Sequence, residues 1–194
     1  MIDAYGHVSL RSPRNPERYY LARSVAPELV EEADLIEYDL DSRPIDADVG
    51  KSARESVHER FIHGEIYRAR PEVMCVVHNH SPSVVPFSVT GVPMKALWHM
   101  AAFIGDGLPT WEIRDVRKGT DLLVRDGALG ASLAKTLGAK PAALMRGHGS
   151  VTVGESLPRA VGRSIYLEQS ARMQMQAIAL AGANGSIKIG RAHV

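Results

Sequence analysis

The feature that most constrains the fold is a pair of short, nearly unbroken apolar runs that each lead into histidine. Val73–Val77 leads into His78-Asn79-His80, and Ala142–Met145 leads into Arg146-Gly147-His148-Gly149. Apolar runs of this length are typical of strands that are buried on both faces. The chain must therefore build a sheet with a buried interior, and polar side chains must gather where its strands end.

Segments with helical periodicity alternate with these strands, which indicates an α/β fold. The expected helices are Glu55–Ala69, Val84–Thr90, Asp121–Leu137 and a last helix that Ser156 caps and that runs to about Gly182. Shorter strands are expected at His7–Arg11, Tyr19–Leu21 and Leu35–Asp39. No internal repeat or interdomain linker interrupts the pattern.

Composition narrows the class of protein. The chain has 194 residues, 45% of them hydrophobic and 23% charged, as expected of a single globular domain. Its formal net charge of +1 gives no reason to expect nucleic acid or an anionic membrane as partner. A single cysteine, Cys75, excludes an internal disulfide framework and a multi-cysteine zinc site. No apolar run is long enough to span a bilayer, so we expect a cytoplasmic protein.

The histidines point to a metal site. His78 and His80 lie two residues apart at a strand end, so alternation places both side chains on one face. His148 follows another buried strand, between two glycines that allow a sharp turn. Three imidazoles with open positions are typical of a catalytic metal site. The alternative is two solvated histidines at a strand end, and it holds unless His148 lies beside the pair. Glu59, on the preceding helix, is expected to act as ligand, base or proton donor.

The order and spacing of these residues resemble the class II aldolase/adducin family. The matching segments are Glu59-Arg60-Phe61-Ile62-His63, Ile66-Tyr67, Arg70-Pro71-Glu72-Val73, Val76-Val77-His78-Asn79-His80 and Arg146-Gly147-His148-Gly149. The resemblance covers roughly residues 3 to 182. It implies an α/β/α sandwich with a mixed, largely antiparallel sheet. It also implies one divalent metal ion per subunit on His78, His80 and His148, with Zn²⁺ or Mn²⁺ as the expected ion.

The resemblance also implies an assembly and a chain extent. Members of the family are commonly homotetramers with their sites at subunit interfaces, so we expect the same here. They begin with a helix that this chain lacks, and we therefore expect residues 1–182 to be a class II aldolase/adducin-like domain without its first helix. Residues 183–194 break the preceding helical pattern, and we expect them to be a non-native tail.

Three loops bear on the reaction. Sugar-phosphate aldolases of the family hold phosphate with small residues on three loops. At the corresponding positions this chain has Gly6-His7, Ala22–Pro27 and Ser56-Val57-His58, which depart from that pattern. Larger side chains would fill a phosphate cradle. The chain resembles instead the branch of the family that decarboxylates ortho-hydroxylated aromatic dicarboxylates, such as dihydroxyphthalate or hydroxypyridine dicarboxylate.

That resemblance assigns roles to individual residues. His7, Arg23 and Ser24 are expected to bind the small-molecule carboxylate, with Arg23 gripping a second carboxylate. Glu59 is expected to protonate the ring carbon. His99 lies where the family brings a residue toward a neighbouring subunit's site, although the register leaves Trp98 as the alternative. His63 and Tyr67 are expected to support the site without contacting substrate.

Two other functions stay open at this stage. One is a sugar-phosphate aldolase, epimerase or dehydratase with a rebuilt phosphate pocket. The other is a non-catalytic, adducin-like interaction module. The joint presence of Glu59, His78, His80 and His148 argues against the module, because a protein without chemistry has no need of metal ligands.

Overall fold

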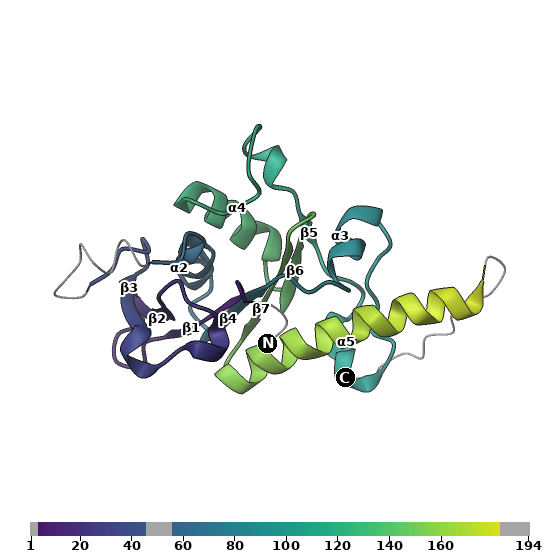
Figure 1. The fold of residues 1–194 in the computed structure, drawn as a ribbon, viewed down its shortest axis with the longest axis horizontal. Helices are drawn as coiled ribbons and strands as arrows, with labels where there is room; N and C mark the ends of the chain where they lie inside the picture. The colour runs from purple at the N-terminus through teal and green to yellow at the C-terminus, as the bar shows by residue number, and fades with distance from the viewer. Residues whose placement is uncertain (1–3, 46–55, 183–194) are drawn as a thin grey trace.

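The structure, a computed structural model, describes residues 4–45 and 56–182. Seven strands in these residues form one sheet in the order β3-β2-β1-β4-β7-β6-β5 (Figure 1). The strands are β1 (His7–Arg11), β2 (Arg18–Ala22), β3 (Leu35–Asp39), β4 (Cys75–Asn79), β5 (Thr110–Trp111), β6 (Ala142–Met145) and β7 (Gly149–Gly154). Neighbouring strands are antiparallel except β5 and β6, which run parallel. The predicted mixed, largely antiparallel sheet is confirmed.

Helices cover both faces of this sheet (Figure 1). On one face lie α2 (Arg60–Ala69) and α4 (Gly127–Leu137). On the other lie α3 (Val85–Thr90), the 3-10 helix η3 (His99–Ile104) and the long helix α5 (Leu157–Ala181). Three short 3-10 helices complete the described part of the chain: η1 (Pro27–Leu29), η2 (Glu32–Asp34) and η4 (Ile113–Asp115). The predicted α/β/α layers are confirmed.

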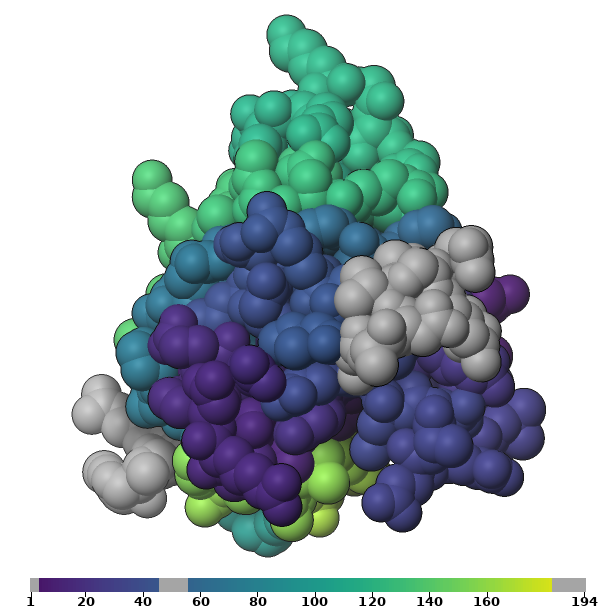
Figure 2. All heavy atoms as spheres, turned by 90° about the vertical axis from the view of Figure 1, so that its left-hand side faces the viewer, coloured from purple at the N-terminus to yellow at the C-terminus, as the bar shows by residue number. Residues whose placement is uncertain are grey.

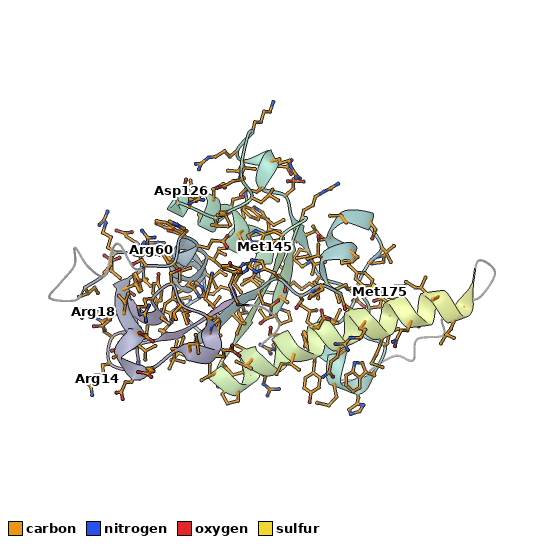
Figure 3. All side chains as sticks on the ribbon, in the orientation of Figure 1. Arg14, Arg18, Arg60, Asp126, Met145 and Met175 are labelled. Carbon is orange, nitrogen blue, oxygen red and sulfur yellow. The ribbon has the colours of Figure 1, made fainter. Side chains whose placement is uncertain are left out.

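Strand β6 shows why an unbroken apolar run belongs at the centre of this sheet. Ala143 and Met145 pack into the core shared with α2 and α4, whereas Ala142 and Leu144 pack into the core shared with α3 and α5. Successive side chains of a strand point to opposite faces, so a strand covered on both sides must be apolar throughout. Figure 3 labels Met145 in the middle of the molecule, at the end of this strand.

Strand β4 places its side chains in the same alternating way. Cys75 and Val77 face the α5 side, and Val76 faces the side of α2 and α4. His78 shares the parity of Val76 and therefore points toward α2 and α4. His78 therefore faces the same helical layer as Glu59, which is the residue immediately before α2.

Several elements differ from expectation. Strand β4 is Cys75–Asn79 rather than Val73–Val77, because His78 and Asn79 pair with the neighbouring strands, and β5 was not predicted. The helix expected from Asp121 begins at Gly127, where the side chain of Asp126 accepts a hydrogen bond from the backbone N–H of Leu129. Figure 3 labels Asp126 beside α4. The strand β7 was not predicted, although Val151 and Val153 alternate with polar residues in it. The helix expected from Glu55 is described from Arg60, and Glu55 itself lies outside the described residues. Residues 183–194, expected to be a non-native tail, also lie outside them.

The N-terminal strands form one end of the molecule. Figure 2 shows this end in purple and blue, with the teal to green segment that joins β5 to α4 rising above it. Part of that connecting segment, Asp121–Leu123, returns to line a cavity beside β1, as described below. No helix among the described residues is long and apolar enough to cross a membrane.

Candidate metal centre

Three separate segments bring the candidate ligands together. His78 is the fourth residue of β4, and His80 directly follows that strand. His148 lies in the turn between β6 and β7, and β7 pairs with β4 so that Asn79 faces Ser150. Glu59 is the residue immediately before α2. The antiparallel pairing of β4 with β7 is what places His148 beside the His78–His80 pair.

Two glycines make the turn of His148. Gly147 has a φ of 66°, a left-handed conformation that suits glycine. Gly149 has no such φ, but a Cβ built on it would lie 2.2 Å from the backbone oxygen of Asn79. The first glycine is needed for the turn and the second for the close approach of β7 to β4. Both requirements agree with the predicted role of the Gly-His-Gly sequence.

The nitrogen spacing fits one small divalent ion. The Nε2 atom of His80 lies 3.2 Å from that of His78 and 3.1 Å from that of His148. A tetrahedral zinc ion with nitrogens at about 2.0–2.1 Å holds them roughly 3.3–3.4 Å apart. Oε2 of Glu59 lies 3.5 Å from the Nε2 atoms of His78 and His148, and all four donor atoms lie within 4.8 Å of one another.

The outer nitrogens of two rings fix which way their lone pairs point. Nδ1 of His78 lies 3.1 Å from the backbone oxygen of Ser150, and Nδ1 of His148 lies 2.9 Å from that of Leu122. A carbonyl oxygen only accepts, so each Nδ1 carries the proton in the neutral ring. Both Nε2 atoms then direct lone pairs toward the cluster. Converging lone pairs repel one another unless a cation lies between them, so the donor set fits a metal ion.

Glu59 is held in place at one oxygen and faces the cluster with the other. Oε1 accepts a hydrogen bond of 2.9 Å from the backbone N–H of Val124, and the residue is only 5% exposed. Burial acts to raise the pKa of Glu59, but the imidazoles of His78 and His148 outweigh it and hold that pKa well below its usual range. Glu59 is therefore a carboxylate at neutral pH.

The neighbouring histidines respond differently to the same surroundings. Burial lowers the pKa of His78, which keeps its ring neutral, as a metal ligand must be. Burial also acts to lower the pKa of His148, but its contact with the Glu59 carboxylate raises that pKa above the ordinary value.

A cavity of about 630 Å³ opens beside this cluster. It is lined by the predicted substrate residues His7, Arg23 and Ser24, together with Glu59, His80 and His148. Its remaining wall is largely apolar: Val8, Val25, Ala26, Pro27, Val30, Leu35, Val57, Leu122 and Leu123. The structure thus places the predicted substrate residues around one space with Glu59, His80 and His148, whereas His78 does not line it.

Arg23 is tethered within this cavity. Its Nε donates a 2.6 Å hydrogen bond to Oδ1 of Asp34, which belongs to η2. A hydrogen bond from the backbone N–H of Glu31 lowers the pKa of Asp34, and the hydrogen bond from Arg23 lowers it further. The tether uses only the Nε of Arg23 among the contacts described for this side chain, and the binding of a second carboxylate by its guanidinium stays a prediction.

His99 lies elsewhere. It is exposed on η3 and borders a different cavity, with Tyr166 and Arg163 of α5. Trp98 instead turns toward α5 and donates a 3.0 Å hydrogen bond from Nε1 to Oγ of Ser170. Within one chain, therefore, His99 does not join the Glu59 cavity, and its contact with a neighbouring subunit's site stays a prediction.

The segment Asp121–Val124 belongs to the site but was not predicted to. Leu122 supplies the acceptor for His148, and Val124 supplies the donor for Glu59. Both contributions are made by the backbone, so side-chain patterns do not reveal them. Asp121, whose Oδ1 accepts from the N–H of Leu123, marks a turn that argues against the expected helix.

Comparison with known proteins places this geometry in context. The family model described as "Class II Aldolase and Adducin N-terminal domain" matches residues 2–175. The chain is 37% identical over 196 residues to Decarboxylase tropJ from Talaromyces stipitatus, which covers 94% of this chain and 72% of that protein. It is 28% identical to a 3,4-dihydroxyphthalate decarboxylase from Arthrobacter keyseri, over 92% of this chain and 72% of that protein.

Solved structures agree on the fold. L-fuculose 1-phosphate aldolase from Glaciozyma antarctica has a TM-score of 0.74 at 26% identity, covering 95% of this chain and 68% of that one. An aldolase II superfamily protein from Pseudomonas syringae has a TM-score of 0.77 at 21% identity, covering 95% and 70%, and shows the fold alone.

Proposed function

This chain belongs to the class II aldolase and adducin family, and we propose that it is a divalent-metal-dependent decarboxylase of an ortho-hydroxylated aromatic or pyridine dicarboxylate. The observation that carries the proposal is the convergence of Glu59, His78, His80 and His148 at one end of a cavity that also holds Arg23. The similarity to named decarboxylases supports the reaction type.

The donor set suits a metal ion in a catalytic role. His78, His80 and His148 would hold the ion, and Zn²⁺ or Mn²⁺ fits imidazole ligands with a nearby carboxylate. When bound, the ion supplies a Lewis acid that stabilises negative charge on a ring oxygen as carbon dioxide leaves.

Glu59 is assigned the proton transfers. As a carboxylate, it accepts the proton of the ring hydroxyl at Oε2 while Val124 holds Oε1. It then returns this proton to the ring carbon that carries the carboxylate. The bond between that carbon and the carboxylate breaks, its electron pair flows into the ring and restores aromaticity, and carbon dioxide leaves. Water supplies the last proton to the ring oxygen.

Other residues orient the substrate. Arg23 is assigned to the second carboxylate, and His7 and Ser24 to further oxygens of the substrate. The apolar wall that includes Val57 and Leu122 contacts the ring face and excludes water from it. We further propose that the protein acts as a homotetramer in which His99 reaches the cavity of a neighbouring subunit.

A sugar-phosphate lyase is the second candidate, favoured by the likeness to the Glaciozyma aldolase. Its substrate would place a phosphate near His7, Arg23 and His58, which line the same cavity. Competitive inhibition by inorganic phosphate at low concentration would favour this candidate. A decarboxylase for aromatic acids should be insensitive to it.

Carbon dioxide release tests the proposal. Metal-loaded protein is incubated with a panel of aromatic and pyridine dicarboxylates, each with and without the ortho hydroxyl. We expect release from at least one hydroxylated member, none from its partner without the hydroxyl, and none with Glu59→Gln. Release that ignores the hydroxyl or survives Glu59→Gln would contradict the proposed chemistry.

A further inference from the structure

A chain of hydrogen-bonded polar side chains lies buried beneath the cavity. The Tyr67 hydroxyl lies 2.7 Å from Oγ of Ser9, and the same Oγ lies 2.6 Å from Nδ1 of His63. Nε2 of His63 lies 2.6 Å from Nδ1 of His7. Each of these four residues is at most 7% exposed, and His7 is the member that lines the cavity.

The hydroxyl of Tyr67, at one end of this hydrogen-bond relay, sets the donor and acceptor of every hydrogen bond in it. Among the described residues, Ser9 is the one acceptor within hydrogen-bonding distance of the Tyr67 hydroxyl. A buried hydroxyl that does not donate loses a hydrogen bond without compensation, so Tyr67 donates to Ser9. Burial raises the pKa of Tyr67 and so keeps its proton in place. Ser9, which accepts from Tyr67, must in turn donate to Nδ1 of His63.

The proton positions on the two histidines follow from this direction of the hydrogen bonds. Nδ1 of His63 accepts from Ser9, and Nε2 of His63 lies 2.6 Å from Nδ1 of His7. An imidazole that accepts at one nitrogen carries its proton on the other. His63 therefore donates from Nε2 to Nδ1 of His7, and His7 carries its own proton on Nε2.

That last N–H has no partner in the part of the chain that the structure describes. Nε2 of His7 is buried and makes no hydrogen bond among the described residues. The ring centroid of His7 lies 5.0 Å from that of His78, next to the candidate metal centre. A buried donor left unsatisfied is costly, and the cavity that His7 lines is where a ligand would supply the acceptor.

We infer that Tyr67, Ser9 and His63 are positioning residues that fix His7 as a hydrogen-bond donor, and that His7 recognises a carboxylate oxygen of the substrate. The identity of that ligand rests on the proposed function, whereas the direction of the hydrogen bonds from Tyr67 to His7 does not. His7 is accordingly a substrate-binding residue that cannot accept a proton at Nε2, which leaves proton transfer to Glu59.

The proton position on His7 is directly measurable. Long-range proton–nitrogen NMR of histidine-labelled, metal-loaded protein distinguishes a ring protonated at Nε2 from one protonated at Nδ1, with His7→Gln assigning the signal. We expect the Nε2–H form. Observation of the Nδ1–H form in the unmodified protein would overturn the inference without any variant.

A matched pair of variants tests the relay. Ser9→Ala removes the hydroxyl that donates to His63, whereas Ser42→Ala removes a buried serine hydroxyl that accepts from another buried tyrosine, Tyr19, at 2.9 Å. We expect Ser9→Ala to turn His7 into a mixture of both forms. It should weaken calorimetric binding of salicylate, used as the carboxylate probe, about tenfold. Ser42→Ala should change neither.

The outcomes separate this inference from the proposed function. Equal salicylate affinity in Ser9→Ala and the unmodified protein would overturn the relay. The Nε2–H form together with salicylate binding, but without carbon dioxide release from any hydroxylated aromatic acid, would uphold the relay and reject the decarboxylase.

Discussion

His78 uses its two ring nitrogens for different purposes. Nδ1 donates to the backbone oxygen of Ser150, and this bond orients Nε2 toward His80 and Glu59. His148 is oriented in the same way by Leu122. A ligand that is fixed in tautomer and direction before the ion arrives binds it more tightly than a free imidazole does.

Removing His78 should therefore remove the metal. We expect His78→Ala to bind Zn²⁺ or Mn²⁺ about 100-fold more weakly or worse, because one oriented ligand is lost. Metal content after dialysis, measured by atomic emission, checks this. The matched control is His99→Ala, which removes an exposed histidine outside the cavity. Full metal content in His78→Ala would contradict the ligand assignment.

Replacing Glu59 should separate binding from chemistry. In Glu59→Gln the amide oxygen still accepts from Val124, and the three histidines remain, but the side chain can no longer accept and return a proton. We expect metal to be retained and kcat to fall about 100- to 10,000-fold. Unchanged turnover at full metal content would place the proton transfer on another group.

At the scale of elements, the sequence pattern predicted β1, β3 and β6 with their bounds but missed β5 and β7. Ala142–Met145 and Leu35–Asp39 are strands with the predicted bounds, because alternation and burial leave a direct mark on side-chain type. The start of α4 was misplaced because Leu122 and Leu123 continue its apolar pattern. Leu122 instead adopts a φ of 72° and turns its carbonyl toward His148, which a hydrophobic pattern does not reveal.

The contact between β4 and β7 gives a sharp test at this scale. In Gly149→Ala the new methyl group would overlap the Asn79 carbonyl, so the strands must separate next to His148. We expect the free energy of unfolding to fall by about 1–3 kcal/mol, measured by urea denaturation, and metal affinity to fall with it.

Gly162→Ala is the control for that substitution. Gly162 lies within α5, and a Cβ on it meets nothing within 4 Å. Alanine favours a helix over glycine by up to about 1 kcal/mol, so this variant should be as stable as the unmodified protein or more so. If both alanines had the same effect, the close approach at Gly149 would not be what requires glycine there.

For the whole molecule, the sheet is what converts distant sequence positions into a site. His7 lies on β1, and His78 lies on the neighbouring strand β4. His148 immediately precedes β7, which pairs with β4 on its other side. Local patterns identified His78 and His148, whereas the resemblance to a family identified His7 and grouped the three. The order of the strands, the tether between Arg23 and Asp34, and the buried relay from Tyr67 to His7 depend on tertiary packing that no single segment encodes.

A metal ion that joins three strands and a helix start should stabilise the entire fold. At an ion concentration of 100 times Kd, binding adds about 2.7 kcal/mol to the free energy of unfolding. For a chain of this size we expect a Tm about 5–10 °C higher than that of the chelator-treated protein. The difference should shrink as pH falls, because protonated imidazoles release the ion. Equal Tm values with and without bound metal would contradict the assignment.

The proposed homotetramer is tested by mass in solution. Light scattering during gel filtration should give about four times the 21.1 kDa of one chain. A tetramer in which His99→Ala lowers kcat while metal content is unchanged would support its contact with a neighbouring site. A fully active monomer would exclude that role for His99.

A metal titration of carbon dioxide release tests most directly whether the chain is a metal-dependent decarboxylase. Chelator-treated protein is reloaded in steps with Zn²⁺ or Mn²⁺ and assayed on the best hydroxylated aromatic dicarboxylate. We expect no release from the metal-free protein and a rise that reaches its plateau at one ion per chain, absent in His78→Ala. Full release from the metal-free protein, or a rise that His78→Ala leaves unchanged, would show that the reaction does not depend on this metal site.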